Sequence, residues 1–175
     1  MKSVIAGSIL LASVFSLPAF ADEFKPNRSE FSFSGNITSS SYSGGGASST
    51  TRMLDGSYGY YFTPQIVGQV VVVDFQSSSV GLSIVGVGAK YYFSQGKQGD
   101  FVPWVTGELD LTSVSMASGS GGGAGISGAI GATYWLTETA GPFVDLRFRQ
   151  SSFSIAGFSQ TETDTILEVG ATLKF

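Results

Sequence analysis

The sequence predicts an all-β fold, an eight-stranded antiparallel up-and-down β-barrel, on three observations. The first is strict alternation over residues 163–175, where apolar and polar side chains occupy opposite parities. Such alternation indicates a strand with one apolar and one polar face. The second and third are a repeat of prolines and a recurring aromatic cluster. Because a free apolar edge promotes aggregation, such a strand fits best in a closed barrel, which has no edge.

The prolines mark four units of nearly equal length. Pro26, Pro64, Pro103 and Pro142 are spaced 38, 39 and 39 residues apart. Proline suits the beginning of a strand because it cannot donate to the strand ladder. Each unit fits one β-hairpin, which gives eight strands in total. We expect the strands at about residues 30–41, 52–62, 65–75, 82–93, 102–112, 125–136, 142–152 and 163–175.

The composition narrows the classes of function. Of the 175 residues, 13% are charged, whereas ordinary soluble domains have about 25%. The net charge is −4 and no basic cluster is present, so a nucleic-acid partner is not expected. Cysteine and histidine are absent. Disulfides are therefore excluded, and the most common general base and metal ligand is missing.

Residues 1–21 have the pattern of a cleaved secretory signal peptide. Lys2 precedes a mostly apolar run, and Ala19-Phe20-Ala21 is a small-x-small cleavage site. An anchor helix is the alternative, which the nearby Pro18 disfavours. We expect a short periplasmic lead over 22–29 and one barrel domain over 30–175. No other segment has the roughly 18 consecutive apolar residues of a transmembrane helix, so a membrane location requires a transmembrane β-barrel.

The predicted connections fall into two sets at opposite ends of the barrel. One set adjoins the aromatic clusters and comprises 63–64, 94–101 and 137–141. The other set is rich in glycine and serine and comprises 42–51, 76–81, 113–124 and 153–162. Membrane barrels of bacteria have short periplasmic turns and longer outer loops. The lengths differ only modestly here, so the orientation rests more on where the termini lie: we expect the Gly/Ser-rich set to face outward and the aromatic end to face the periplasm.

Aromatic residues gather at the end of each even-numbered strand. We interpret them as a girdle at the membrane–water interface, formed by Tyr60, Phe62, Tyr91, Phe93, Tyr134 and Phe175. Aromatic residues in the core of a soluble barrel are the alternative. The charges of these strands then fall on the inward parity. For the strand at 65–75, placing Asp74 inward turns Val67, Val71, Val73 and Phe75 to the lipid together with Gln69.

The inward parity predicts a charged lumen. Its members are Glu108, Asp110, Asp145, Arg147, Arg149 and Glu168, with Lys90 and Lys174 nearer the periplasmic end. We expect Arg147 to lie directly opposite Glu168 on the last hairpin, and Glu108 and Asp110 to reach the arginines across the lumen. Buried charges need partners, and eight strands enclose a lumen just wide enough for side chains. A wide pore is therefore not expected.

Several features together resemble the small outer-membrane β-barrel proteins of Gram-negative bacteria, the porin-family and OmpA/OmpX-like barrels. They are the signal peptide, the alternating strands, the G-x-K-Y-Y-F segment at 88–93 and the C-terminal aromatic residue. The resemblance implies a cell-envelope protein that contacts outer-membrane lipids and is inserted by the barrel assembly machinery. It also implies that alternate residues of the last strand are the assembly signal: Leu167, Val169, Ala171, Leu173 and Phe175.

The sequence thus predicts a non-enzymatic barrel with a structural or surface-interaction role and a lumen filled by charged side chains. Similar barrels that act on lipid A rely on histidine with serine, and this chain has no histidine. It lacks a G-x-S-x-G elbow and a metal-ligand cluster. The glycine run 119–123 has no G-K-[ST] ending and is expected to be a loop. We expect no catalytic, cofactor-binding or metal-binding residues, and a monomer. The alternatives are a small channel or carrier for small solutes or apolar ligands, and a soluble secreted ligand-binding β-barrel.

Overall fold

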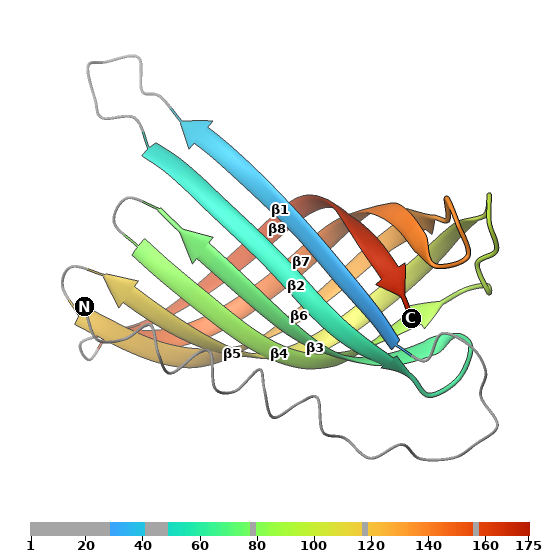
Figure 1. The fold of residues 1–175 in the computed structure, drawn as a ribbon. Helices are drawn as coiled ribbons and strands as arrows, with labels where there is room; N and C mark the ends of the chain where they lie inside the picture. The colour runs from blue at the N-terminus through green and yellow to red at the C-terminus, as the bar shows by residue number, and fades with distance from the viewer. Residues whose placement is uncertain (1–28, 41–48, 78–79, 117–118, 156–157) are drawn as a thin grey trace.

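A computed structural model describes residues 29–40, 49–77, 80–116, 119–155 and 158–175. These residues form a closed antiparallel barrel in which each strand pairs with its neighbours in sequence and β8 returns to β1 (Figure 1). The strands are β1 (Ser29–Ser40), β2 (Ser49–Tyr61), β3 (Ile66–Gln76), β4 (Val80–Tyr92), β5 (Phe101–Met116), β6 (Gly119–Tyr134), β7 (Ala140–Ile155) and β8 (Phe158–Lys174). The predicted fold class is confirmed.

The predicted signal peptide and most of the predicted lead lie outside the described residues, and Ser29 already belongs to β1. Within the part of the chain that the structure describes, no helix is long and apolar enough to cross a membrane.

The strands extend further from the termini than the sequence indicates. Residues predicted as the loops 113–124 and 153–162 continue β5, β6, β7 and β8, which are 16 or 17 residues long. The glycine run 119–123 pairs with Ile155 and its neighbours on β7 and with Met116 and its neighbours on β5, so the prediction that it is a loop is wrong. Small residues offer no apolar face to a periodicity argument, but their backbone can still join a ladder.

These longer strands also remove one argument for the orientation of the barrel. The connection between β4 and β5 at the end that carries the chain termini spans residues 93–100. At the opposite end, only residues 117–118 separate β5 from β6 and only 156–157 separate β7 from β8. The Gly/Ser-rich connections are therefore not longer as a set, since only 41–48, between β1 and β2, matches the eight residues of 93–100. The position of the termini remains as the indication of orientation.

Two turns at the terminal end share one chemistry. The Thr63 hydroxyl accepts hydrogen bonds from the backbone of Gln65 and Ile66 at 3.3 and 2.9 Å. Thr137 accepts in the same way from Thr139 and Ala140 at 3.2 and 2.9 Å. Such hydroxyl–backbone bonds stabilise tight turns. Such turns help to fix the register between the strands that they connect, β2–β3 and β6–β7.

The repeated prolines within the described strands lie where the backbone N–H is not needed as a hydrogen-bond donor to one of the two neighbouring strands. Pro103 pairs with Ala132 on β6, while the β4–β5 ladder ends at Tyr92–Trp104. Pro142 likewise pairs with Ala171 on β8, beyond the last β6–β7 pair. Pro103 and Pro142 thus lie near the start of their strands, where one neighbouring ladder has ended. Pro64 lies in the turn before β3, and Pro26 lies outside the described residues.

The barrel closes where β1 meets β8 at the termini. Pairing runs from Glu30–Lys174 to Ser34–Gly170, and the backbones of Ser29 and Phe175 exchange two hydrogen bonds of 3.1 and 2.9 Å. Inside this seam the hydroxyls of Ser32 and Thr172 lie 2.8 Å apart. The two strands separate toward the other end of the barrel (Figure 1). Closure therefore depends on the last residues of β8.

The two faces of the barrel wall have opposite polarity. The outward side chains in the middle of β5, β6 and β8 are aliphatic and exposed; Leu109, Ile130 and Val169 are 57–65% exposed. Inward side chains of the same strands include the buried Glu108, Ser127 and Glu168. A soluble protein buries its apolar residues, so this wall has the polarity expected where the outside faces lipid.

The structure reverses the predicted faces of β3. Val67, Gln69, Val71 and Val73 are buried inside, and Phe75 packs beside them, whereas Asp74 lies on the outer face. Asp74 accepts a hydrogen bond from Gln76 at 3.1 Å and lies 3.9 Å from Arg52. The prediction is wrong because it assumed that a strand carboxylate must point inward. Near a strand end, an outward carboxylate is solvated and paired instead.

Beyond the aliphatic belt, the outer face of β5–β8 becomes small and polar. Ser113 and Ser115 follow Leu111 on β5, and exposed hydroxyls form cross-strand pairs on the last hairpin. Ser152–Thr161 and Ser154–Ser159 are 3.0 and 2.9 Å apart. The apolar belt therefore ends at a defined height, above which the hairpins are hydrophilic.

This change of polarity along one strand gives a test of the outer face. Leu109→Arg places a charge in the middle of the belt and should cost about 2–4 kcal/mol of folding free energy in lipid, whereas Ser115→Arg should cost about 0–1 kcal/mol. Both positions are outward on β5, so strand and face are matched. The measurement is urea unfolding of the two variants in lipid vesicles. Equal costs would contradict the assigned belt.

Candidate functional site in the barrel lumen

The inward face of β6 has no large side chain between residues 125 and 131. The inward residues there are Gly125, Ser127, Ala129 and Gly131. Because these residues leave space above the sheet, long side chains of β7 reach over β6 to β5. A side chain at Gly131 would collide with Trp104 and Asp145. The charged residues of β5 and β7 therefore meet over one intervening strand, and not across the full lumen as the sequence suggested.

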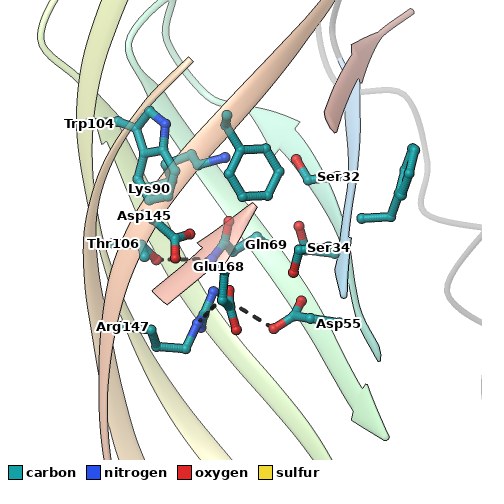
Figure 2. A pocket seen from close by; sticks show the side chains of 13 residues that line it. Ser32, Ser34, Asp55, Gln69, Lys90, Trp104, Thr106, Asp145, Arg147 and Glu168 are labelled. Atoms are coloured by element: carbon teal, nitrogen blue, oxygen red, sulfur yellow. Dashed lines mark hydrogen bonds and ion pairs between the residues drawn. The ribbon is translucent and has the colours of Figure 1, made fainter. Parts of the chain in front are cut away.

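Arg147 is the centre of the charged residues. Its Nη1 donates to Glu108 Oε2 at 2.6 Å, its Nε donates to Glu168 Oε2 at 3.3 Å, and its Nη2 lies 3.8 Å from Asp55 Oδ2. All four side chains are buried. The planar fork of a guanidinium suits several carboxylates at once. Arg147 thus joins β2, β5 and β8 to β7 through a single side chain. Figure 2 shows its position beside Asp55 and Glu168.

The predicted opposition of Arg147 and Glu168 is off by two residues. The β7–β8 register pairs Arg147 with Ile166 and places Asp145 directly opposite Glu168. Arg147 reaches Glu168 as a diagonal neighbour. The error follows from the hairpin length, because the sequence does not reveal where the β7–β8 connection is centred when its flanks are serine, threonine and glycine.

Glu108 has partners for both of its oxygens. Oε1 accepts from Gln69 Nε2 at 2.8 Å and from the Thr106 hydroxyl at 3.2 Å. Oε2 accepts from Ser127 at 2.9 Å in addition to Arg147. Gln69 is the residue that the predicted β3 face would have exposed to lipid. Its true role is to bind a buried carboxylate, which satisfies two polar groups at once.

A small cavity lies beside these residues. Its walls include Asp55, Asp145 and Glu168, together with Ser32 and Ser34 (Figure 2). About 20 Å³ is available to the centres of water-sized molecules, and about 10–15 Å³ suffices for one water. Each of these three carboxylates has one buried oxygen with no hydrogen-bond partner among the described residues: Asp55 Oδ2, Asp145 Oδ1 and Glu168 Oε1.

A second charged pair lies farther from the termini. Arg149 Nε is 3.6 Å from Asp110 Oδ2, and both side chains are buried. Neither oxygen of Asp110 has a hydrogen-bond partner among the described side and main chains, and the same holds for the nearby hydroxyls of Thr112 and Ser151. This level of the lumen is therefore less completely hydrogen-bonded than the level of Arg147.

The sequence prediction omits a cluster at the terminal end of the lumen, centred on Glu30. Glu30 is 1% exposed and accepts from Tyr61 at 2.6 Å, Tyr92 at 2.9 Å and Lys90 at 3.0 Å. These partners come from β2 and β4, so Glu30 ties the first strand to the wall beside it. Lys90 also lies 4.6 Å from the ring centre of Trp104.

Lys174 and Trp135 complete this cluster. Lys174 Nζ lies 3.6 Å from the ring centre of Trp135 and 5.6–5.8 Å from those of Tyr92 and Tyr61. Such cation–π contacts stabilise a partly desolvated ammonium group. Trp135 is fully buried, and the β4–β5 turn packs on it at Gly96, where a side chain would collide with the indole. Aromatic rings thus fill the lumen at the terminal end.

A parity signal for this cluster is present in the sequence. In the triplets Tyr60-Tyr61-Phe62, Tyr91-Tyr92-Phe93 and Tyr134-Trp135-Leu136, the middle residue must point opposite to its neighbours. The middle residues are buried and the outer members lie on the outer face. Glu30 begins the first predicted strand on the inward parity, and the same alternation assigns it to the lumen.

The residues predicted as a girdle and as an assembly signal lie on the outer wall. Near the terminal end, aromatic rings contact one another. The ring centres of Tyr60 and Phe62 are 5.7 Å apart, and those of Tyr91 and Phe93 are 5.3 Å apart. The ring centres of Phe175 and Tyr58 are 6.3 Å apart. Leu167, Val169 and Leu173 are exposed on the outer face of β8. Their roles toward lipid and assembly proteins remain predictions.

Chemically, the lumen is an arrangement of ion pairs, hydroxyls and aromatic rings. Among the described residues no group of three Asp or Glu side chains converges as a metal centre does. A buried, wall-to-wall network of this kind can hold strands together and obstruct the lumen. The class of protein that the fold and the lumen define is a narrow eight-stranded β-barrel with an apolar outside and a polar inside.

Comparison with known proteins supports this class at the level of the fold. The barrel is similar to the N-terminal β-barrel domain of OprF from Pseudomonas aeruginosa, with a TM-score of 0.61, 16% identity and coverage of 85% of this chain and 98% of that one. It is also similar to Neisserial surface protein A (NspA), with a TM-score of 0.62, 16% identity and coverage of 84% of this chain and 95% of that one. A third similar structure is the outer membrane protein OprG from P. aeruginosa, with a TM-score of 0.54, 16% identity and coverage of 85% of this chain and 97% of that one. No family model and no curated protein sequence matches the chain.

The geometry of the arginines gives a matched pair of variants. Arg147→Met should lower the free energy of unfolding by about 3–5 kcal/mol, because it leaves buried carboxylates without their cation. Arg149→Met, two residues along the same face, should lower it by less, because Arg149 has one carboxylate at 3.6 Å. Urea unfolding of both variants in detergent micelles measures the difference. A larger loss for Arg149→Met would show that Arg147 is not the centre of the network.

Proposed function

We propose that this chain is an integral outer-membrane β-barrel with a structural or surface-interaction role and a lumen closed by its own side chains. The observation that carries the proposal is the inverted polarity of the wall. Exposed leucine, isoleucine and valine side chains surround the outside, while six carboxylates and their cations lie inside. Only a surrounding hydrocarbon phase makes that arrangement favourable, since water would favour the reverse.

The orientation in the proposal follows from the two ends of the barrel. The end with the termini has an outer ring of tyrosine and phenylalanine, which suits a membrane interface. The other end extends as hydroxyl-rich hairpins above the apolar belt. We assign the termini to the periplasm, which fits export through a cleaved signal peptide and insertion by the assembly machinery. The hydroxyl-rich hairpins then face the outside of the cell and are the surface available for contacts there.

A closed lumen favours this role over a pore. The aromatic rings around Lys174 obstruct the terminal end, and Arg147 with its three carboxylates obstructs the middle. A catalytic role finds no support in the residues present, since the chain has no histidine and no cysteine. The barrel is proposed to act as a monomer that contacts outer-membrane lipids directly.

Localisation is the first test of the proposal. Cell fractionation should recover the protein with the outer membrane, and the folded protein should migrate differently on a gel before and after heating. The Leu109→Arg variant serves as a control that should accumulate outside the membrane fraction. Recovery of the native protein in the soluble periplasm, without a heat-dependent shift, would contradict the membrane assignment.

Conductance tests the closed lumen separately. The purified barrel in planar lipid bilayers should give no stable, reproducible single-channel steps. A variant with Trp135→Ala and Arg147→Ser removes both obstructions and should conduct if it folds, which makes it the positive control. Regular steps from the native protein would show an open path and replace the structural role with that of a small channel.

A further inference from the structure

The inside of the barrel has more negative than positive groups. Glu30, Asp55, Glu108, Asp110, Asp145 and Glu168 are buried in the lumen, and the cations beside them are Lys90, Arg147, Arg149 and the half-buried Lys174. Six buried carboxylates therefore face three buried cations and Lys174 among the described residues, and the half-buried Asp164, opposite Arg149 on the inward parity of β8, adds one more carboxylate. Buried charge without compensation is costly, so the position of the excess carboxylates indicates where compensation is needed.

Asp145 is the carboxylate with the poorest compensation. It is 3% exposed, and no Lys or Arg nitrogen of the described residues lies within 4.0 Å of it. Its neighbour on β6 is Gly131, which has no side chain, and its neighbour on β8 is Glu168. Like charges that are directly opposite on one face of a sheet destabilise the pair. This pair is nevertheless buried.

Both residues of this pair line one cavity. Asp145 Oδ1 and Glu168 Oε1 have no hydrogen-bond partner among the described residues, and both residues border the space of about 20 Å³ (Figure 2). Asp55, which also borders it, adds a third such oxygen, and its Arg147 partner is 3.8 Å away. The rest of the polar wall comprises the hydroxyls of Ser32, Ser34, Ser57 and Thr106, the amide of Gln69, and two cations, Lys90 and Arg147. The closest ion pairs of these cations are with Glu30 and Glu108, respectively.

We propose that this cavity is a binding site for a small monovalent inorganic cation, of the size of Na⁺ or K⁺, held between Asp145 and Glu168. Hard cations prefer carboxylate, hydroxyl and water oxygens, and carboxylates and hydroxyls are among the groups around the cavity. A divalent metal centre is the weaker choice because no three Asp or Glu side chains of the described residues converge. The space admits one or two water-sized species, so a bulky organic cation does not fit.

This site would give the closed lumen its missing positive charge. The cation offsets the repulsion between Asp145 and Glu168 and leaves Arg147 to bind Glu108, Glu168 and Asp55. The proposal concerns the folded lumen alone and does not depend on which membrane surrounds the barrel. Its test therefore has an outcome separate from that of the proposed function.

The test compares stability in small and bulky cations at constant ionic strength and neutral pH. The purified protein, folded in zwitterionic detergent micelles, is unfolded with urea in chloride salts of Na⁺, K⁺ or N-methylglucamine. The unfolding equilibrium constant should fall about tenfold in Na⁺ or K⁺ once the ion is at about nine times its Kd. Identical stability in all three salts would overturn the proposal and leave water or a shared proton as the occupant.

Two variants locate the effect. Asp145→Asn keeps the size of the side chain but removes its charge, and it should abolish the difference between small and bulky cations. Asp110→Asn is the matched control, because Asp110 is equally buried in the lumen but is paired with Arg149. It should retain the difference. Loss of the difference in both variants, or in neither, would show that the cation acts elsewhere.

A measurement on the native protein does not depend on the variants folding. Crystals grown with Rb⁺ should show an anomalous scattering peak between Asp145 and Glu168. The absence of that peak at a Rb⁺ concentration that stabilises the protein in solution would overturn the assignment of the site.

Discussion

The constraint on which this structure depends is that hydrocarbon can receive neither charges nor unpaired backbone groups. Closure of β1 on β8 satisfies the backbone, and alternation along each strand turns the charges inward. The consequence is a narrow interior that must accommodate six carboxylates. Their arrangement is a problem of space as much as of charge. The small residues of β6 solve it, because they let Arg147 extend over that strand to Glu108 while its other nitrogens face β2 and β8.

The two ends of the lumen solve the same problem with different chemistry. Toward the termini, aromatic rings surround Lys90 and Lys174 and supply partial negative charge through their faces. Glu30 connects those rings to the first strand through two tyrosine hydroxyls. Toward the other end, one wall becomes apolar where Met53, Val71, Val73 and Ile84 pack together. The excess of carboxylates is therefore concentrated in the middle, where the cavity lies, and this concentration gives the cavity its proposed affinity for cations.

The proline repeat and the alternation were sufficient to predict the number of strands, and alternation with the aromatic ends and the charges predicted the faces of β2 and β4–β8. These faces could be predicted because the two sides of the wall differ most in the belt. The same signals were not sufficient where that difference vanishes. β3 has valines on both faces, so a single charge, Asp74, decided its orientation, and that charge lies near the strand end. The Gly/Ser-rich ends have no apolar face at all, which hid the extra length of β5–β8 and the two-residue shift between Arg147 and Glu168. The position of Gly131 beside Asp145, which helps to leave Asp145 without a cation, follows only from the strand register.

The charged lumen also bears on how such a chain would reach the membrane that we propose for it. A buried ion pair is often no more stable than apolar side chains of the same volume, so stability alone does not explain why the inward parity is polar. Apolar side chains on both faces would lengthen the continuous apolar segments, and about 18 such residues make a transmembrane helix. β3 comes nearest to that composition, and it is only 11 residues long, with Gly68 and Gln69 within it. In the other strands, the charged residues that fill the lumen also interrupt the apolar runs. A polar lumen is thus a consequence of needing strands that are apolar enough for lipid on one side and too polar overall to insert as helices.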